Sequence, residues 1–135
     1  MLEKQFGSAH YRQIISSEAA PKAVGPYSQA VKANGFVFVS GQLALDPGTG
    51  QLVGRDIKQQ TRRVLENISA ILAASGSSLG KVVRCGVFLK EMNDFGPMNE
   101  EYTSFFKESP PARTTVQAAK LPRDALIEID AVAML

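Results

Sequence analysis

The strongest constraint on the fold is the dipeptide Asn34-Gly35, which separates two stretches with β-strand character. Asn-Gly favours the left-handed backbone conformation that a two-residue hairpin turn requires. Residues 27–34 and 36–40 are therefore predicted to be two antiparallel strands. The second strand runs into Gly41, where the missing Cβ would let a ligand approach the backbone closely. The chain is thus expected to be built on an antiparallel sheet.

Two further strands are predicted near the C-terminus, at residues 110–117 and 126–133, and the turn-type segment 121–124 joins them. Because strand side chains alternate between faces, Glu128 lies opposite the apolar residues that flank it. Arg113 opens the first of these strands. A pairing of the two strands would bring Arg113 and Glu128 close together. The pair is then either an exposed ion pair, worth about 0–1 kcal/mol, or part of a site.

Two amphipathic helices are predicted at about residues 56–75 and 95–107, with Asp56 as the N-cap of the first and Asn93-Asp94 as the cap of the second. Additional strands at residues 14–16 and 81–90 give the order β-β-β, α, β, α, β-β, which is α+β in class with both helices on one face of a mixed sheet. The other sheet face would carry uncovered apolar side chains, which indicates an interface with another chain. The expected members of that face are Val31, Val87 and Val116.

Composition narrows the functional classes. A chain of 135 residues suits one domain, and residues 14–135 are assigned to it, with residues 1–13 as an N-terminal tail that has no apolar core of a secretory signal. The net charge of +2 gives no electrostatic argument for nucleic-acid binding. No apolar run approaches the roughly 18 residues of a membrane helix.

Cysteine and histidine usage excludes several kinds of site. The sole cysteine, Cys85, falls in the strand predicted at 81–90 and is expected to be a buried, inert thiol. The sole histidine, His10, lies in the tail. No metal-ligand set and no Ser-His or Cys-His catalytic pair is therefore expected. A single cysteine also fits a reducing compartment.

Four short blocks of the chain carry a family resemblance. They are Gly25-Pro26-Tyr27-Ser28-Gln29-Ala30, then Ser40-Gly41-Gln42, then Asn93-Asp94-Phe95 with Asn99, and finally Pro111-Ala112-Arg113-Thr114-Thr115-Val116 followed by Leu121-Pro122 and Ile127-Glu128-Ile129. In this order, over roughly residues 14–134, the blocks resemble the RidA/YjgF family of imine deaminases. One block alone would be weak, but four in register argue against chance.

The resemblance implies both a fold and a reaction. The implied fold is chorismate-mutase-like, a homotrimer with a central barrel-like β-core and with sites in the clefts between subunits. The implied reaction is the cofactor-free hydrolysis of reactive 2-imino acids, such as 2-iminobutanoate and 2-iminopropanoate, to 2-oxo acids and ammonia. Pyridoxal-phosphate-dependent dehydratases release the corresponding enamines, so the role would be metabolite damage control. A cytoplasmic location is expected, with an organelle left open.

The resemblance also assigns roles to residues. Arg113 would hold the substrate carboxylate through a bidentate pair, and Glu128 would orient the attacking water and move a proton towards the leaving ammonia. The remaining expected ligand-binding positions are Tyr27, Ser40, the Gly41 backbone N–H, Asn99 and Thr115. Thr115 stands where many relatives carry a cysteine, so its expected effect is on substrate preference.

Two alternatives of other classes remain open. One is a regulatory module that binds a small carboxylate without turnover; Arg113 fits both readings, whereas Glu128 favours an enzyme because a carboxylate binder gains nothing from an opposed negative charge. The other is an RNA-acting protein, an endoribonuclease or translation inhibitor. Near-neutral charge, the lack of a histidine pair and the lack of an aromatic-basic stripe argue against nucleic acid. The basic side chains of the helix at 56–75 are most simply a solvated face.

Overall fold

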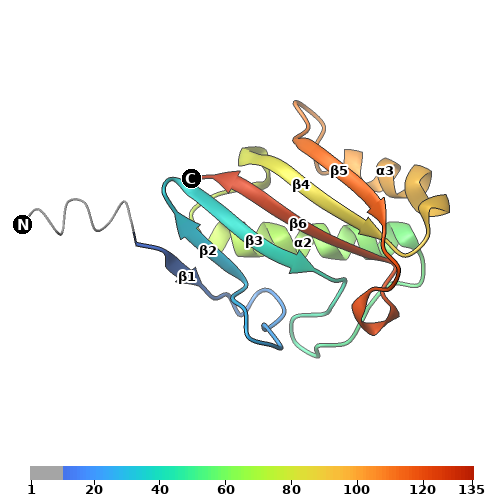
Figure 1. The fold of residues 1–135 in the computed structure, drawn as a ribbon, viewed down its shortest axis with the longest axis horizontal. Helices are drawn as coiled ribbons and strands as arrows, with labels where there is room; N and C mark the ends of the chain where they lie inside the picture. Colours follow the sequence, from blue (N-terminus) through green and yellow to red (C-terminus); the bar gives the residue numbers. More distant parts are fainter. Residues whose placement is uncertain (1–10) are drawn as a thin grey trace, which may run out of the picture.

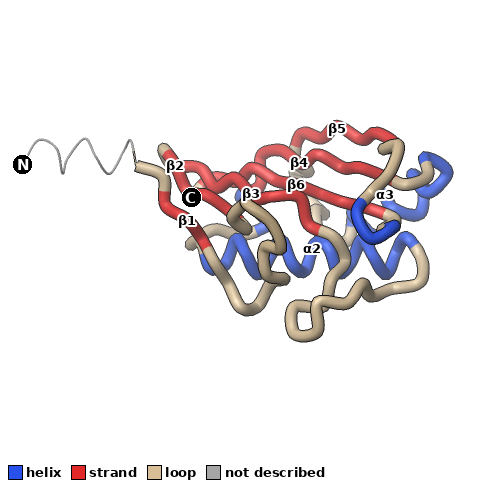
Figure 2. Tube along the Cα trace, turned by 60° about the horizontal axis from the view of Figure 1, so that its bottom comes forward, coloured by secondary structure: helices blue, strands red, loops and turns tan. Residues whose placement is uncertain are grey.

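The computed structural model describes residues 11–135 and shows one six-stranded sheet in the order β1-β2-β3-β6-β4-β5 (Figure 1). All neighbouring strands are antiparallel except β4 and β5, which are parallel. Helices α2 and α3 lie on the same side of this sheet (Figure 2). The elements are β1 Gln13–Ile15, β2 Ala30–Ala33, β3 Phe36–Gln42, α2 Ile57–Ala74, β4 Val82–Leu89, α3 Phe95–Thr103, β5 Ala112–Gln117 and β6 Ile127–Met134.

The hairpin between β2 and β3 is confirmed. Asn34 and Gly35 have φ values of 54° and 85°, the left-handed conformation that the turn requires. However, β2 begins at Ala30, three residues later than predicted. The buried Gln29 explains this late start, because its side-chain amide bonds the backbone of Ser17 and Pro21. The preceding residues therefore belong to a loop that packs on the segment after β1.

Helix α2 follows the prediction closely. The Asp56 carboxylate accepts the Gln59 N–H at 2.9 Å, and the Gln59 side chain accepts the Arg55 N–H at 2.6 Å, so the two side chains cap the helix reciprocally. At the C-terminal end Gly76 has a φ of 83°, as expected for a helix stop. The apolar stripe is buried against the sheet: Ile57, Val64, Leu65, Ile68, Ile71 and Leu72.

Helix α3 ends at Thr103, four residues before its predicted end. Asp94 occupies the N-cap position, as predicted, but its side chain makes no capping hydrogen bond; a short 3-10 turn at Met92–Asp94 leads into the helix. Phe106 lies beyond the helix but is still buried in the core. The Phe106 side chain thus packs in the core as the apolar pattern predicts, although the backbone at this position is no longer helical.

Only one of the two faces of the sheet is covered by helices. The face towards the helices forms the core. The face away from them, here named the open face, carries exposed apolar side chains. Val87 is only 1% exposed and pairs with Ile129 on the helix side, so its predicted place on the open face is wrong. Large exposed residues at open-face positions are Ile14, Phe36, Phe38, Val116 and Met134.

Candidate functional site

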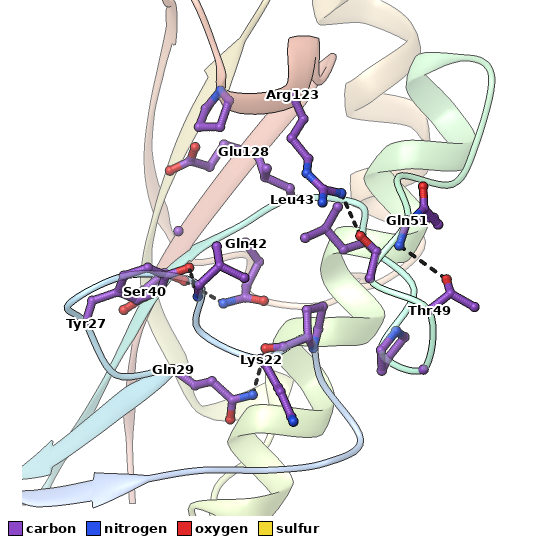
Figure 3. A pocket seen from close by; sticks show the side chains of 18 residues that line it. Lys22, Tyr27, Gln29, Ser40, Gln42, Leu43, Thr49, Gln51, Arg123 and Glu128 are labelled. Atoms are coloured by element: carbon purple, nitrogen blue, oxygen red, sulfur yellow. Dashed lines mark hydrogen bonds between the residues drawn. The ribbon is translucent and has the colours of Figure 1, made fainter.

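A cavity of about 770 Å³ lies where β3 ends and β6 begins. Figure 3 shows Tyr27, Ser40 and Glu128 on one side of it and Thr49 and Gln51 on the other. The loop after β3 and the short turn before β6 therefore wall a space that local sequence patterns did not reveal. Its volume falls in the range of small-molecule sites, about 300–1,000 Å³.

Glu128 is the acidic group of this cavity. It is half-buried on β6, and a Cβ placed on Gly41 would overlap its carboxylate, so any larger residue at position 41 would push this side chain out of its observed position. Burial raises the pKa of Glu128, and the negative charge of Asp130 raises it further. Asp130 is itself held by the Gly86 N–H, which donates to its Oδ1 at 2.8 Å. Glu128 is thus a carboxyl group poised to exchange protons.

Ser40 and Tyr27 form the rest of this wall. The Ser40 hydroxyl donates to the Ser28 carbonyl at 2.6 Å, which fixes its oxygen. Tyr27 lies in the loop before β2, and its hydroxyl accepts the Val24 N–H at 3.3 Å while its side chain is half exposed. We name Tyr27, Ser40, Gly41 and Glu128 the Glu128 half-site.

Arg113 lies elsewhere, on the helix side of the edge strand β5. Its guanidinium carbon is 4.8 Å from the centroid of the Tyr102 ring and 5.6 Å from that of Phe95. Its Nη1 also contacts the Met98 sulfur at 4.0 Å. Within residues 11–135 no carboxylate pairs with Arg113. The guanidinium is therefore oriented by aromatic rings, while its capacity to bind an anion is unused.

Unpartnered oxygens gather in the same region. Asn99 Oδ1, the Tyr102 hydroxyl and Thr115 Oγ1 are buried without a hydrogen-bond partner among the described residues. Thr115 follows Arg113 by two residues on the same face of β5. Buried polar atoms usually have a hydrogen-bond partner, so these three oxygens are available to a ligand or to a second chain. We name Asn99, Tyr102, Arg113 and Thr115 the Arg113 half-site.

The two half-sites do not meet within one chain. Strand β4 lies between β5 and β6, so the predicted pairing of the two C-terminal strands is wrong. Arg113 pairs with Cys85, whereas Glu128 pairs with Phe88. Positions three apart on a strand point to opposite faces. Arg113 therefore faces the helices, and Glu128 faces the open side.

The comparisons with known proteins identify the family. A profile of the family described as "Endoribonuclease L-PSP" matches residues 17–135, and a mouse protein named 2-iminobutanoate/2-iminopropanoate deaminase is 44% identical, covering 94% of this chain and 94% of its own length. The chain belongs to the RidA/YjgF family.

Other proteins of the RidA/YjgF family are also similar to this chain. A RutC family protein of Pyrococcus horikoshii is 56% identical over 90% of this chain and 97% of its own length. The solved structure of Escherichia coli TdcF with bound serine matches with a TM-score of 0.87 at 41% identity, covering 91% of this chain and 98% of that one. The α+β architecture expected from the sequence is thus the architecture of the family.

Outside the two half-sites and the cavity beside Glu128, the charged and metal-ligating residues of this RidA/YjgF chain show no further candidate site among residues 11–135. On α2, Lys58 pairs with Glu100 at 2.5 Å and Arg62 pairs with Glu101 at 2.6 Å, so two of the basic side chains are bound to α3. Burial raises the pKa of Cys85, which keeps this thiol protonated. Between residues 11 and 135, no group of three or more His, Cys, Asp and Glu side chains is placed to hold a metal ion. No helix in that part of the chain is long and apolar enough to cross a membrane.

Tyr102 is the member of the half-sites that the sequence did not indicate. Its position on an apolar helix face predicts core packing, and it is indeed buried, with 5% exposure. Only the fold shows that its ring lies against Arg113. The other half-site members coincide with positions that the family resemblance assigned.

Proposed function

We propose that this chain hydrolyses reactive 2-imino acids to 2-oxo acids and ammonia. Membership of the RidA/YjgF family and the 44% identity to a mouse protein named 2-iminobutanoate/2-iminopropanoate deaminase support this reaction class. The observation that carries the proposal is the ring-held Arg113 guanidinium without an acidic partner among the described residues. A planar guanidinium held in this way suits bidentate binding of a small carboxylate.

The proposal includes a site shared between two chains of a homotrimer. Arg113 and Glu128 lie on opposite faces, so one chain supplies only half of the chemistry. Strand β5 is a sheet edge, which a second chain can reach. The open face carries a row of exposed apolar side chains of the kind that another subunit covers. We therefore assign the Arg113 half-site to one subunit and the Glu128 half-site to its neighbour.

The chemistry of the joined site is hydrolysis without a redox change. Arg113 holds the substrate carboxylate. The Glu128 carboxylate of the neighbouring subunit accepts a proton from a water molecule as the water oxygen bonds to C2 of the substrate. For a substrate bound as its protonated imine, C2=NH2+, the same proton then passes to the nitrogen, which becomes an NH3+ group. As the C2–N bond breaks and ammonia leaves, the hydroxyl group on C2 gives its proton to Glu128, which passes it to the departing ammonia, and C2 becomes a carbonyl. The raised pKa of Glu128 eases these transfers, because it lies closer to neutrality than that of a solvated carboxyl group. The Gly41 N–H and Ser40 border the reacting atoms.

Two other functions have specific support. TdcF was crystallised with bound serine, which fits a small-carboxylate sensor as well as an enzyme; turnover of freshly generated imine separates these readings. The family description names an endoribonuclease. In this chain Lys58 and Arg62 are engaged in ion pairs rather than presented as a free basic stripe. An RNA-acting protein would show RNA binding with steep salt dependence.

The proposal is tested with Arg113→Ala in a coupled assay. A pyridoxal-phosphate-dependent dehydratase generates the imine, and the added release of ammonia above the spontaneous rate is measured. We expect the wild type to accelerate release and Arg113→Ala to lose that acceleration while its circular dichroism stays unchanged. Arg55→Ala, which removes an exposed cation away from both half-sites, is the matched control. Wild-type ammonia release by Arg113→Ala would remove the role assigned to this residue.

A further inference from the structure

The cavity beside Glu128 extends well beyond the reacting atoms. Its volume of about 770 Å³ suits ligands larger than the three- and four-carbon imino acids implied by the family. The extension is bounded by the loop after β3, which includes Thr49 and Gln51, and by Pro122 and Arg123 before β6 (Figure 3). The space therefore has room for a substrate side chain with a polar end.

Charge in this cavity is unbalanced. Its charged lining residues in the described part of the chain are Lys22, Arg123 and Glu128, two cations and one acid. Neither Lys22 nor Arg123 takes part in an ion pair within residues 11–135. A concave surface with an excess of one charge concentrates ligands of the opposite charge. Glu128 already serves the reacting end, so the charge of Arg123 is available to an anion.

Arg123 is held in place by an unusual backbone. Both Arg123 and Asp124 are non-glycine residues in the left-handed region, with φ of 58° and 55°. Such conformations cost energy and persist where the surroundings fix them, often at ligand sites. Here Asp124 pairs with Lys90 at 2.9 Å, and the Arg123 Nη1 donates to the Gly50 carbonyl at 2.6 Å. This bond uses one guanidinium nitrogen, while the others make no hydrogen bond within residues 11–135.

The opposite wall is equally well fixed. The Asn67 side chain of α2 donates to the carbonyls of Leu43 and Leu45 at 3.2 and 2.9 Å. The Asp46 carboxylate accepts the N–H groups of Gly48 and Thr49 at 2.8 and 2.9 Å. The loop is thereby anchored at its base and closed at its tip. A wall organised in this way loses little entropy when a ligand binds.

We propose that Arg123 binds the side-chain carboxylate of an acidic 2-imino acid, so that dicarboxylic imines are substrates of this protein. The inference rests on the proposed function, since it places the imine carbon of the same molecule at Glu128. The neighbouring subunit's Arg113 half-site takes the first carboxylate, and the Arg123 end takes the second. A charge-assisted bond of this kind distinguishes acidic from neutral side chains by about ten- to hundredfold.

The test compares an acidic imine with a neutral one. Amino-acid oxidases generate 2-iminosuccinate from aspartate and 2-iminoglutarate from glutamate, and a dehydratase generates 2-iminobutanoate; ammonia release gives kcat/KM for each. We expect Arg123→Gln to lower kcat/KM for at least one acidic imine by about ten- to hundredfold and to leave 2-iminobutanoate within about twofold. Arg123→Lys keeps the charge and should retain most of the preference. Arg55→Gln, an exposed cation outside the cavity, should change neither substrate.

Two results overturn the inference while leaving the proposed function intact: no turnover of either acidic imine by an enzyme that hydrolyses 2-iminobutanoate, or an equal loss for acidic and neutral imines in Arg123→Gln. If no imine at all is hydrolysed, the proposed function fails. The acidic subsite is then tested separately, by measuring the binding of 2-oxo acids. Calorimetry with oxaloacetate, 2-oxoglutarate and 2-oxobutanoate should then show tighter binding of a diacid that Arg123→Gln abolishes. Equal binding of all three compounds contradicts the acidic subsite.

Discussion

Replacing the Tyr102 ring should weaken substrate binding through Arg113. The ring centroid lies 4.8 Å from the guanidinium carbon, whereas Phe95 contributes the second, more exposed ring at 5.6 Å. Tyr102→Leu removes the buried partner and leaves Arg113 free to adopt other rotamers. In the proposed mechanism, Arg113 holds the substrate carboxylate in both the ground state and the transition state. The effect should therefore fall mainly on KM.

The expected size of the effect follows from the contact. A cation–π interaction is worth about 0.5–2 kcal/mol between exposed and desolvated limits. Its loss corresponds to a decrease in kcat/KM of about two- to thirtyfold. Tyr102→Phe keeps the ring and removes a hydroxyl that is buried without a partner among the described residues. This variant should keep a KM for 2-iminobutanoate much closer to that of the wild type than Tyr102→Leu does, because the ring that orients Arg113 remains.

The assay needs a control for simple loss of packing. The Phe106 ring stacks on Tyr102 with centroids 4.7 Å apart and is also buried. Phe106→Leu should lower the thermal midpoint to a similar extent as Tyr102→Leu but leave KM for 2-iminobutanoate unchanged. An unchanged KM in Tyr102→Leu, or equal KM increases in both leucine variants, would refute the positioning of Arg113 by this ring.

Two further predictions concern Glu128. Gly41→Ala places a methyl group where the Glu128 carboxylate lies, so kcat should fall about a hundredfold. Gly96→Ala, which has open space around its added Cβ, is the control and should leave kcat unchanged. Equal activity of the two variants would contradict the steric argument. Asp130→Asn keeps an oxygen for the Gly86 N–H but removes the charge that raises the pKa of Glu128, so the acidic limb of the kcat/KM profile should move to lower pH. Burial, the larger cause, remains in this variant, and a limb that stays in place or moves upward would count against Asp130 as a neighbour of the base.

Local patterns predict the elements of this fold well. The turn at Asn34-Gly35 and the capped, striped helix α2 depend on interactions between residues that are close in sequence, and both are confirmed. The start of β2 could not be predicted in this way. It depends on Gln29, whose side chain bonds a loop 8 to 12 residues earlier.

The arrangement of the site depends on strand order, which local patterns do not encode. Consecutive strands are neighbours in most sheets, and that expectation placed Arg113 next to Glu128. Instead β4 inserts between their strands. As a consequence, Arg113 and Glu128 lie on opposite faces of the sheet. They form two separate half-sites and not an ion pair within one chain. Tyr102 shows the same limit, since its contact with Arg113 joins α3 to β5.

The central claim is that one subunit's Arg113 works with its neighbour's Glu128, and subunit mixing tests it most directly. Arg113→Ala and Glu128→Gln should each be inactive alone and sediment as trimers. After the two variants are unfolded together and refolded at equal amounts, about a quarter of the interfaces combine two intact half-sites, so about a quarter of wild-type imine hydrolysis should return. If the mixture stays as inactive as its components, although mixed trimers have formed, the shared site is contradicted.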